Sequence, residues 1–241
     1  GHTATGYLRA DTQLEVIYGP QVKISLGLEV LDGQLYGSES FAGQAAGVDD
    51  WQILPPLEQV FVTEFNIQAP VGIGLVRVGR MRSQWGLGIL ANGGERDDEL
   101  FVDESHGDFV NRIQFITRPL VAFLSGPAAK ELTVSVGMDH VEEDDLSSRV
   151  DGDTVRQSIG AIIWRRDALQ VGAYLAYRHM VRGGAELTRA FAADLYGRWS
   201  GSQGTSRKLT LEAEVAGILG STEDVRFEGV DGAVGVGQLG F

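Results

Sequence analysis

Three arginines stand close together in VRVGRMRSQWGLG, residues 76–88. Arg77, Arg80 and Arg82 come shortly before Trp85. If these cations line a water-filled passage, they would favour anions or acidic sugars through close-range charge. If they instead pair with glutamates on neighbouring strands, such as Glu64, they would form a structural ladder of ion pairs. The sequence leaves both interpretations open.

Two acidic segments have side chains that suit hard cations. They are ERDDELFVDES, residues 95–105, and DHVEEDDLSSRVDGD, residues 139–153. Carboxylate oxygens are preferred by Ca²⁺ and Mg²⁺, but neither segment has the spacing of an EF-hand. We therefore expect solvated loops and assign no metal site, with bridging by metal ions to lipopolysaccharide phosphates as a variant.

Catalytic residues are not indicated by the sequence. His106 lies beside Asp103 and Ser105, but a catalytic triad is defined by geometry rather than by such proximity. The chain has no Gly-x-Ser-x-Gly nucleophile elbow and no cysteine, which excludes catalytic thiols. We expect neither an enzyme nor a cofactor.

The elements that would position the charged residues are long alternating strands. In KLTLEAEVAGIL, residues 208–219, apolar and polar side chains alternate, which predicts a strand with two different faces. The same pattern recurs along the chain, and together with less regular segments it gives about eleven strands. These are expected over residues 7–18, 21–30, 60–69, 73–82, 109–118, 131–139, 155–165, 168–181, 188–199, 208–219 and 232–241.

Strand length indicates a membrane barrel. Most of these segments span about 10–12 residues, as tilted transmembrane strands do, whereas soluble strands usually have about 5–6. Short turns alternate with long loops, such as the one expected at residues 83–108, except at residues 119–130. We predict an all-β, antiparallel up-and-down transmembrane barrel of about 12 strands, forming one domain over residues 1–241. An even number of strands could be reached in three ways: by an extra strand within residues 36–54 or 119–127, by chain beyond Phe241, or by a strand from another chain.

The orientation of the two faces follows from this fold. In a membrane barrel the apolar side chains face lipid and the ionisable ones face the lumen. The expected lipid-facing residues are Val22, Ile24, Leu26, Leu28, Phe65, Val134, Val171, Leu175, Leu195, Leu209, Leu211 and Val215. The expected lumen or pore-lining residues are Arg9, Asp11, Glu15, Lys23, Glu29, Glu64, Arg77, Arg112, Arg178, Asp194, Arg198, Lys208, Glu212 and Glu214. Rings near strand ends would form an interfacial girdle: Trp85, Trp164, Trp199, Tyr7, Tyr18 and Tyr177.

Composition narrows the class further. The 241 residues include 33 glycines and only 6 prolines, which suits many strands and tight turns better than disorder. No apolar run is long enough for a transmembrane helix. The net charge of −13 argues against binding to nucleic-acid phosphates. The start of the chain shows no signal peptide, so we expect a mature, trimmed or cytosolic form.

The segment VGRMRSQWGLGILANGG, residues 78–94, followed by HGDFVNRIQFITRP, residues 106–119, resembles a group of outer-membrane β-barrel proteins of myxobacteria and related proteobacteria. LEVLDGQLYGS, residues 28–38, fits the preceding segment of that group. The arginine and Trp-Gly-Leu-Gly pattern is also similar, more distantly, to alginate-export-type porins. The resemblance implies one barrel in the outer membrane and carries no substrate or catalytic residue.

The sequence thus predicts a porin-like channel for small polar solutes or ions in the outer membrane of a Gram-negative bacterium. Its partners would be membrane lipid, lipopolysaccharide and a further chain or copy, but no nucleic acid. Two alternatives stay open. One is a barrel scaffold within a larger envelope complex, without transport. The other is a soluble all-β carrier of small molecules with its apolar face turned inward.

Overall fold

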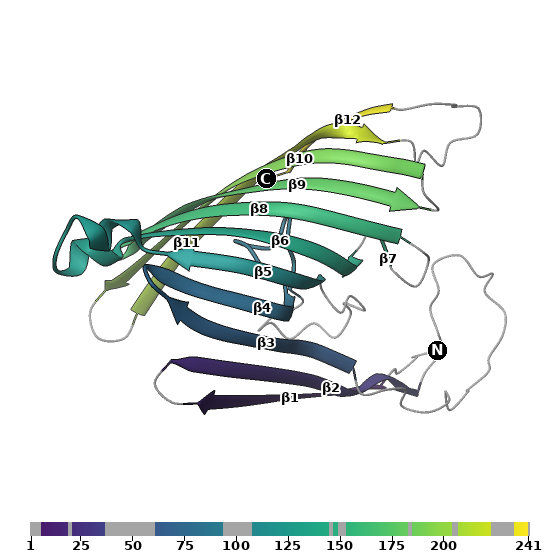
Figure 1. Cartoon of the computed structure of the whole chain (residues 1–241), viewed down its shortest axis with the longest axis horizontal. Helices are drawn as coiled ribbons and strands as arrows, with labels where there is room; N and C mark the ends of the chain where they lie inside the picture. Colours follow the sequence, from purple (N-terminus) through teal and green to yellow (C-terminus); the bar gives the residue numbers. More distant parts are fainter. Residues whose placement is uncertain are drawn as a thin grey trace.

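The fold is almost entirely β-structure (Figure 1). The computed structural model describes residues 6–18, 21–36, 61–93, 108–144, 147–148, 153–182, 185–203, 207–222 and 234–240. The strands are β1 (Gly6–Tyr18), β2 (Val22–Tyr36), β3 (Phe61–Val71), β4 (Gly74–Arg82), β5 (Phe109–Thr117), β6 (Leu132–Asp144), β7 (Ser147–Ser148), β8 (Asp153–Arg166), β9 (Leu169–Arg182), β10 (Ala185–Gln203), β11 (Arg207–Thr222) and β12 (Val234–Gly240). Two short 3-10 helices, η1 (Pro119–Ala122) and η2 (Pro127–Lys130), lie between β5 and β6.

The strands form one antiparallel up-and-down sheet. Its order is β1-β2-β3-β4-β5-β6-β8-β9-β10-β11-β12, and β7 pairs only with β6. This confirms the predicted all-β antiparallel architecture. The sheet curls strongly, so that β11 passes behind β8 and β9 in the view of Figure 1.

The sheet is not closed into a barrel, contrary to the prediction. Among the described strands, β1 pairs only with β2 and β12 only with β11. The direction of the strands is one obstacle to closure. Eleven strands follow one another antiparallel along the sheet, so β1 and β12 run in the same direction. An antiparallel pair between them would need an even number of strands in this path.

Several predicted boundaries are corrected by the structure. Residues 139–144, predicted as part of an acidic loop, belong to β6, because alternation of buried and accessible side chains continues to Val141. Residues 119–127, considered for an extra strand, include η1 and the start of η2, each with a proline in its first turn. The candidate strand at 36–54 and the acidic loop at 95–105 lie outside the described residues, apart from Tyr36 in β2.

The tight turns lie where glycine or a local polar residue permits a left-handed backbone. Gly72 has φ +47° in the turn between β3 and β4, and Asp167 has φ +50° between β8 and β9. An aspartate tolerates this region better than a branched residue does. Among the described residues no helix is long and apolar enough to span a membrane.

The register places one row of apolar side chains across the sheet. Directly paired residues of antiparallel strands share a face, so the row can be followed from β1 to β11. We call this row, which occupies the outer face, the outer row. Its members are Val16, Ile24, Ile67, Val78, Ile113, Met138, Ser158, Tyr177, Phe191 and Leu219.

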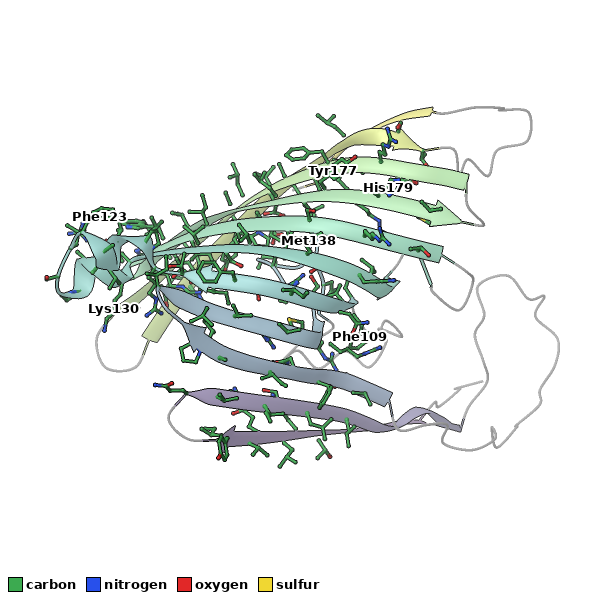
Figure 2. All side chains as sticks on the ribbon, viewed as in Figure 1. Phe109, Phe123, Lys130, Met138, Tyr177 and His179 are labelled. Atoms are coloured by element: carbon green, nitrogen blue, oxygen red, sulfur yellow. The ribbon has the colours of Figure 1, made fainter. Side chains whose placement is uncertain are left out.

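The outer row is accessible rather than enclosed. Every member other than Ser158 is apolar or aromatic, and Ile113, Met138 and Leu219 are each more than 60% exposed. Figure 2 shows Met138 and Tyr177 standing away from the ribbon. The buried apolar residues gather on the other face, in two clusters. The first includes Trp85, Ile159, Tyr174 and Tyr196, and the second is formed by Met81, Val110, Val141, Val155 and Met180.

Candidate functional site

Residues 83–93 form a loop on the inner face, the face opposite the outer row. We call it the inward loop. Its ends are joined to the start of β5, because the backbone N–H of Ser83 donates to the carbonyl of Asp108 over 2.9 Å, and that of Asp108 to the carbonyl of Asn92 over 2.7 Å. Within the loop, Trp85 N–H donates to the Ala91 carbonyl at 3.0 Å. The loop is therefore a hydrogen-bonded unit that starts directly after β4.

The Trp85 side chain fixes the loop to the sheet. Its ring stacks on Tyr174 of β9 with centroids 5.4 Å apart, and its indole Nε1–H donates to Asp194 Oδ1 of β10 over 3.0 Å. Gly172 makes room for the ring, since a Cβ at that position would lie 2.8 Å from it. Trp85 was predicted in the interfacial girdle; it is instead 8% exposed, because it finds both an aromatic and a polar partner inside.

Glu214 of β11 holds the next part of the loop. Its carboxylate accepts a very short hydrogen bond from Leu87 N–H and another of 3.4 Å from Ile89 N–H. Gly86, with φ +52°, brings the backbone against this carboxylate. A carboxylate that accepts two backbone N–H groups replaces the water that these groups would otherwise need.

The loop thus crosses the space enclosed by the curled sheet. It leaves β4 and is held at its ends beside β5, yet Trp85, Leu87 and Ile89 reach β9, β10 and β11, with β6 and β8 lying between along the sheet. Such a crossing is possible only because the sheet curls far enough to bring β4 opposite β11. The inward loop fills the inner side next to β9–β11.

A buried ion pair supports the start of the loop. Arg112 of β5 donates two hydrogen bonds to Asp139 of β6, at 2.6 and 2.8 Å, and a third from Nη2 to Ser83 Oγ at 2.9 Å. The guanidinium is 8% exposed and the carboxylate is fully buried. Two parallel N–H···O bonds give this pair a fixed geometry, which positions Ser83 where the inward loop begins.

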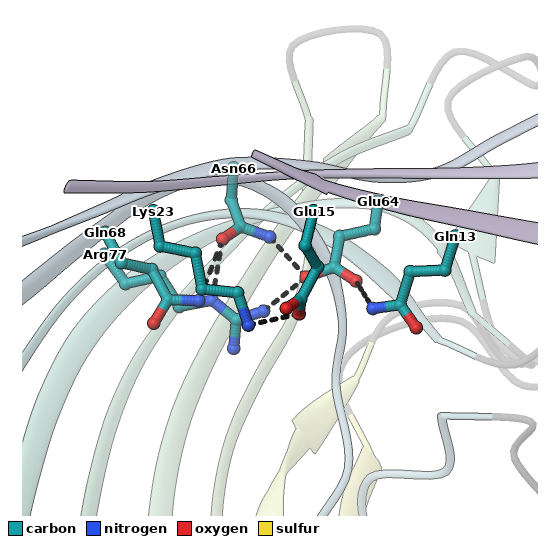
Figure 3. A network of polar contacts seen from close by, with 7 residues as sticks. All are labelled: Gln13, Glu15, Lys23, Glu64, Asn66, Gln68 and Arg77. Atoms are coloured by element: carbon teal, nitrogen blue, oxygen red, sulfur yellow. Dashed lines mark hydrogen bonds and ion pairs between the residues drawn. The ribbon is translucent and has the colours of Figure 1, made fainter. Parts of the chain in front are cut away.

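A second polar cluster on the inner face remains accessible. It comprises the side chains of Gln13, Glu15, Lys23, Glu64, Asn66, Gln68 and Arg77 from β1 to β4 (Figure 3). Arg77 Nη2 donates to Glu64 Oε1 at 2.7 Å, and its Nε donates to Asn66 Oδ1 at 3.1 Å. Lys23 forms an ion pair with Glu15. We call these seven residues the accessible polar cluster.

The three arginines of the opening motif have different positions. Arg77 pairs with Glu64, as the ladder interpretation predicted. Arg80 and Arg82 lie at the end of β4, with their guanidinium carbons 5.3 and 5.4 Å from the centroid of the Phe109 ring. The three arginines do not form one continuous row, because Arg77 and Arg80 are three residues apart in β4 and so belong to opposite faces of the strand.

The ionisable residues predicted for one face do share that face. The register and the contacts place Glu15, Lys23, Glu64, Arg77, Arg112, Arg178, Asp194, Arg198, Glu212 and Glu214 on the inner face. The side chains of Arg9, Asp11, Glu29 and Lys208 lie outside the described part. The residues predicted to face lipid all have outer-face parity, and Phe65, Leu195, Leu209 and Leu211 are each more than half exposed. Contact with lipid itself stays a prediction.

The inward position of residues 83–93 is the feature that sequence reasoning missed. The segment 83–108 was expected as a long loop beyond the strand ends. A signal was present in Trp85-Gly86-Leu87-Gly88, where two glycines beside a large ring allow close backbone approach. No local pattern identifies Asp194 as the partner of Trp85, which is 109 residues away in the chain.

The chain was also compared with known proteins. No protein-family model, curated protein or solved structure matches it. The resemblance to outer-membrane barrels therefore stays a prediction from residues 28–38, 78–94 and 106–119.

Proposed function

We propose that this chain forms a membrane-spanning, porin-like channel of a Gram-negative outer membrane, with the inward loop as its constriction. The observation that carries the proposal is the outer row. Nine of its ten members, all except Ser158, are apolar or aromatic, and they lie on a face that no described segment of the chain covers. A continuous exposed apolar surface of this extent is unfavourable in water and is suited to acyl chains.

The inner face supports the same interpretation. It holds the ion pairs Lys23–Glu15, Arg77–Glu64, Arg112–Asp139 and Arg198–Glu212. A soluble carrier with an apolar cavity would need the reverse arrangement, with its apolar parity enclosed and its charges outside. The exposed outer row favours a membrane protein over such a carrier.

Closure of the barrel is part of the proposal. Lipid leaves no water for unpaired backbone groups, so the free edges of β1 and β12 must be paired. Since β1 and β12 run in the same direction, one further strand antiparallel to both would satisfy the two edges and give an even number. We propose that such a strand completes the barrel.

The proposal is tested by reconstituting the full chain in a planar bilayer after detergent extraction. We expect discrete single-channel conductance steps, together with heat-modifiable migration on a gel. Protein that is extracted without detergent, or folded protein that inserts but gives no conductance, would contradict a channel.

The unpaired edges favour a second candidate, a scaffold that surrounds or docks a partner without transport. In that case the open edges of β1 and β12 would pair with another chain of an envelope complex. Co-purification of a stoichiometric partner with no conductance of the complex would favour this alternative. A conducting single chain would oppose it.

A further inference from the structure

The inner face divides into a filled part and an accessible part. Next to β9–β11 the inward loop covers Tyr174, Asp194 and Glu214, all buried. Next to β1–β4 the side chains of the accessible polar cluster retain contact with solvent, except that of Asn66, which is 1% exposed and lies beneath the others. There, Lys23 and Glu15 are 36% and 42% exposed, and Arg77 and Glu64 are 26% and 20% exposed. A solute on the inner face would therefore meet the accessible polar cluster.

The charges of the described side chains in this accessible part cancel in pairs. Lys23 pairs with Glu15 and Arg77 pairs with Glu64, so the cluster has two cations and two anions. Arg198 of β10 and Glu212 of β11 are also partly exposed, and Arg198 Nε lies 3.6 Å from Glu212 Oε1. The same oxygen accepts a 2.6 Å hydrogen bond from the Tyr196 hydroxyl. Arg178 also has an interaction partner. Of the other acids that the structure places on the inner face, Asp139 pairs with Arg112, and Asp194 and Glu214 hold the inward loop.

Amide side chains complete the accessible polar cluster. Gln13 Nε2 donates to Glu64, Asn66 Nδ2 donates to Glu64, and Gln68 Nε2 donates to Asn66 Oδ1. The Asn66 amide is buried and engaged by its neighbours, so it holds the cluster together. Gln13 and Gln68 are accessible, and each amide has both a donor group and an acceptor oxygen, as sugar hydroxyls do. A surface with many donors and acceptors but no net charge can exchange hydrogen bonds with a hydroxylated solute without attracting an ion of either sign.

From this arrangement we infer that the accessible polar cluster selects uncharged, polyhydroxylated solutes over ions of similar size. The inference rests on the proposed channel and names the class of solute that passes it. Selection depends on the pairing of Arg77 with Glu64. Removal of one partner leaves one uncompensated charge on an otherwise neutral surface.

The test measures swelling of phosphatidylcholine vesicles that contain the full chain. The solutes are a neutral hexose, gluconate and glucosamine, which have similar sizes and different charges. We expect the hexose to enter fastest. Equal or faster entry of either charged solute would overturn the inference while leaving the channel in place. Absence of entry by all three solutes into vesicles with folded, heat-modifiable protein would contradict the channel and the inference together.

Charge variants make the test specific. Glu64→Gln leaves Arg77 unpaired, and the rate of gluconate relative to hexose should rise by about five-fold, the equivalent of about 1 kcal/mol for one unit charge at 4 Å in water. Arg77→Gln should instead favour glucosamine, and the double variant should restore the original order. Arg166→Gln, which removes an exposed charge beside the β8–β9 turn, should leave all ratios unchanged. Unchanged ratios in both single variants would overturn the inference.

Discussion

The hydrogen bond between Trp85 and Asp194 is the contact that most directly fixes the inward loop. Asp194 is 1% exposed, and its Oδ1 accepts the hydrogen bond from the indole N–H. Its Oδ2 has no hydrogen-bond partner among the described residues. A buried carboxylate that loses a donor is left with a large desolvation cost. The position of the inward loop is therefore sensitive to the loss of the Trp85 indole N–H.

Trp85→Phe tests this coupling, because phenylalanine keeps an aromatic ring against Tyr174 and removes only the donor. We expect a loss of about 1–3 kcal/mol in the free energy of unfolding, the usual cost of leaving a buried polar group unsatisfied. Denaturant titration of the reconstituted protein measures it. The matched control is Trp199→Phe, since Trp199 is 41% exposed on the outer face. Equal effects of the two substitutions would show that the indole N–H has no special role.

At the scale of elements, strands and loops differ in how far the sequence determines them. The alternation in residues 208–219 predicted β11 and its two faces, because strand periodicity is a local property. The inward loop could not be predicted in the same way. Its position depends on Tyr174, Asp194 and Glu214, which are brought near Trp85 only by the curl of the whole sheet. The ion pair of Arg77 with Glu64 agrees with the ladder, one of the two alternatives for the three arginines. Arg80 and Arg82 lie against Phe109 instead.

The backbone of the inward loop gives a second prediction. Gly86 has φ +52°, and a Cβ there would collide with the Glu214 carboxylate. Gly86→Ala should therefore displace the loop from Glu214 and raise single-channel conductance. Gly72→Ala is the matched control, because Gly72 has φ +47° and a Cβ there would meet nothing within 4 Å. Gly72→Ala should lower the free energy of unfolding by a similar amount, about 1–2 kcal/mol, because alanine is strained at this φ. It should not disturb the inward loop. If both variants conduct like the parent, the inward loop is not a constriction.

At the scale of the whole molecule, the account depends on which face of the sheet meets lipid. The exposed outer row and the ion-paired inner face have the polarity of a membrane barrel. Eleven strands follow one another along the described sheet, so one more strand would allow an antiparallel closure. The predicted assignment of side chains to the two faces agrees with the structure, whereas the predicted closed barrel does not. Alternation within a strand is encoded locally, but closure depends on how many strands are present.

Arginine substitutions test the polarity of the sheet in a bilayer. Val215→Arg, on the outer face of β11, should cost about 2–4 kcal/mol or prevent insertion, as charges on the lipid side of a membrane strand do. Thr210→Arg places the same charge on the inner face of the same strand and should insert normally. The fraction of heat-modifiable, membrane-integrated protein is the measurement. Normal insertion of both variants would argue against lipid contact at Val215.

The most direct test of the central claim is a spin-label scan along β11 in lipid vesicles. The chain has no cysteine, so single variants from Leu209→Cys to Ala216→Cys can each be labelled at one site. The account predicts that oxygen, which concentrates in lipid, reaches labels at 209, 211, 213 and 215 and largely avoids those at 210, 212, 214 and 216. Labels at Leu209, Leu211 and Val215 that respond instead to a water-soluble relaxation agent would contradict a membrane-spanning sheet.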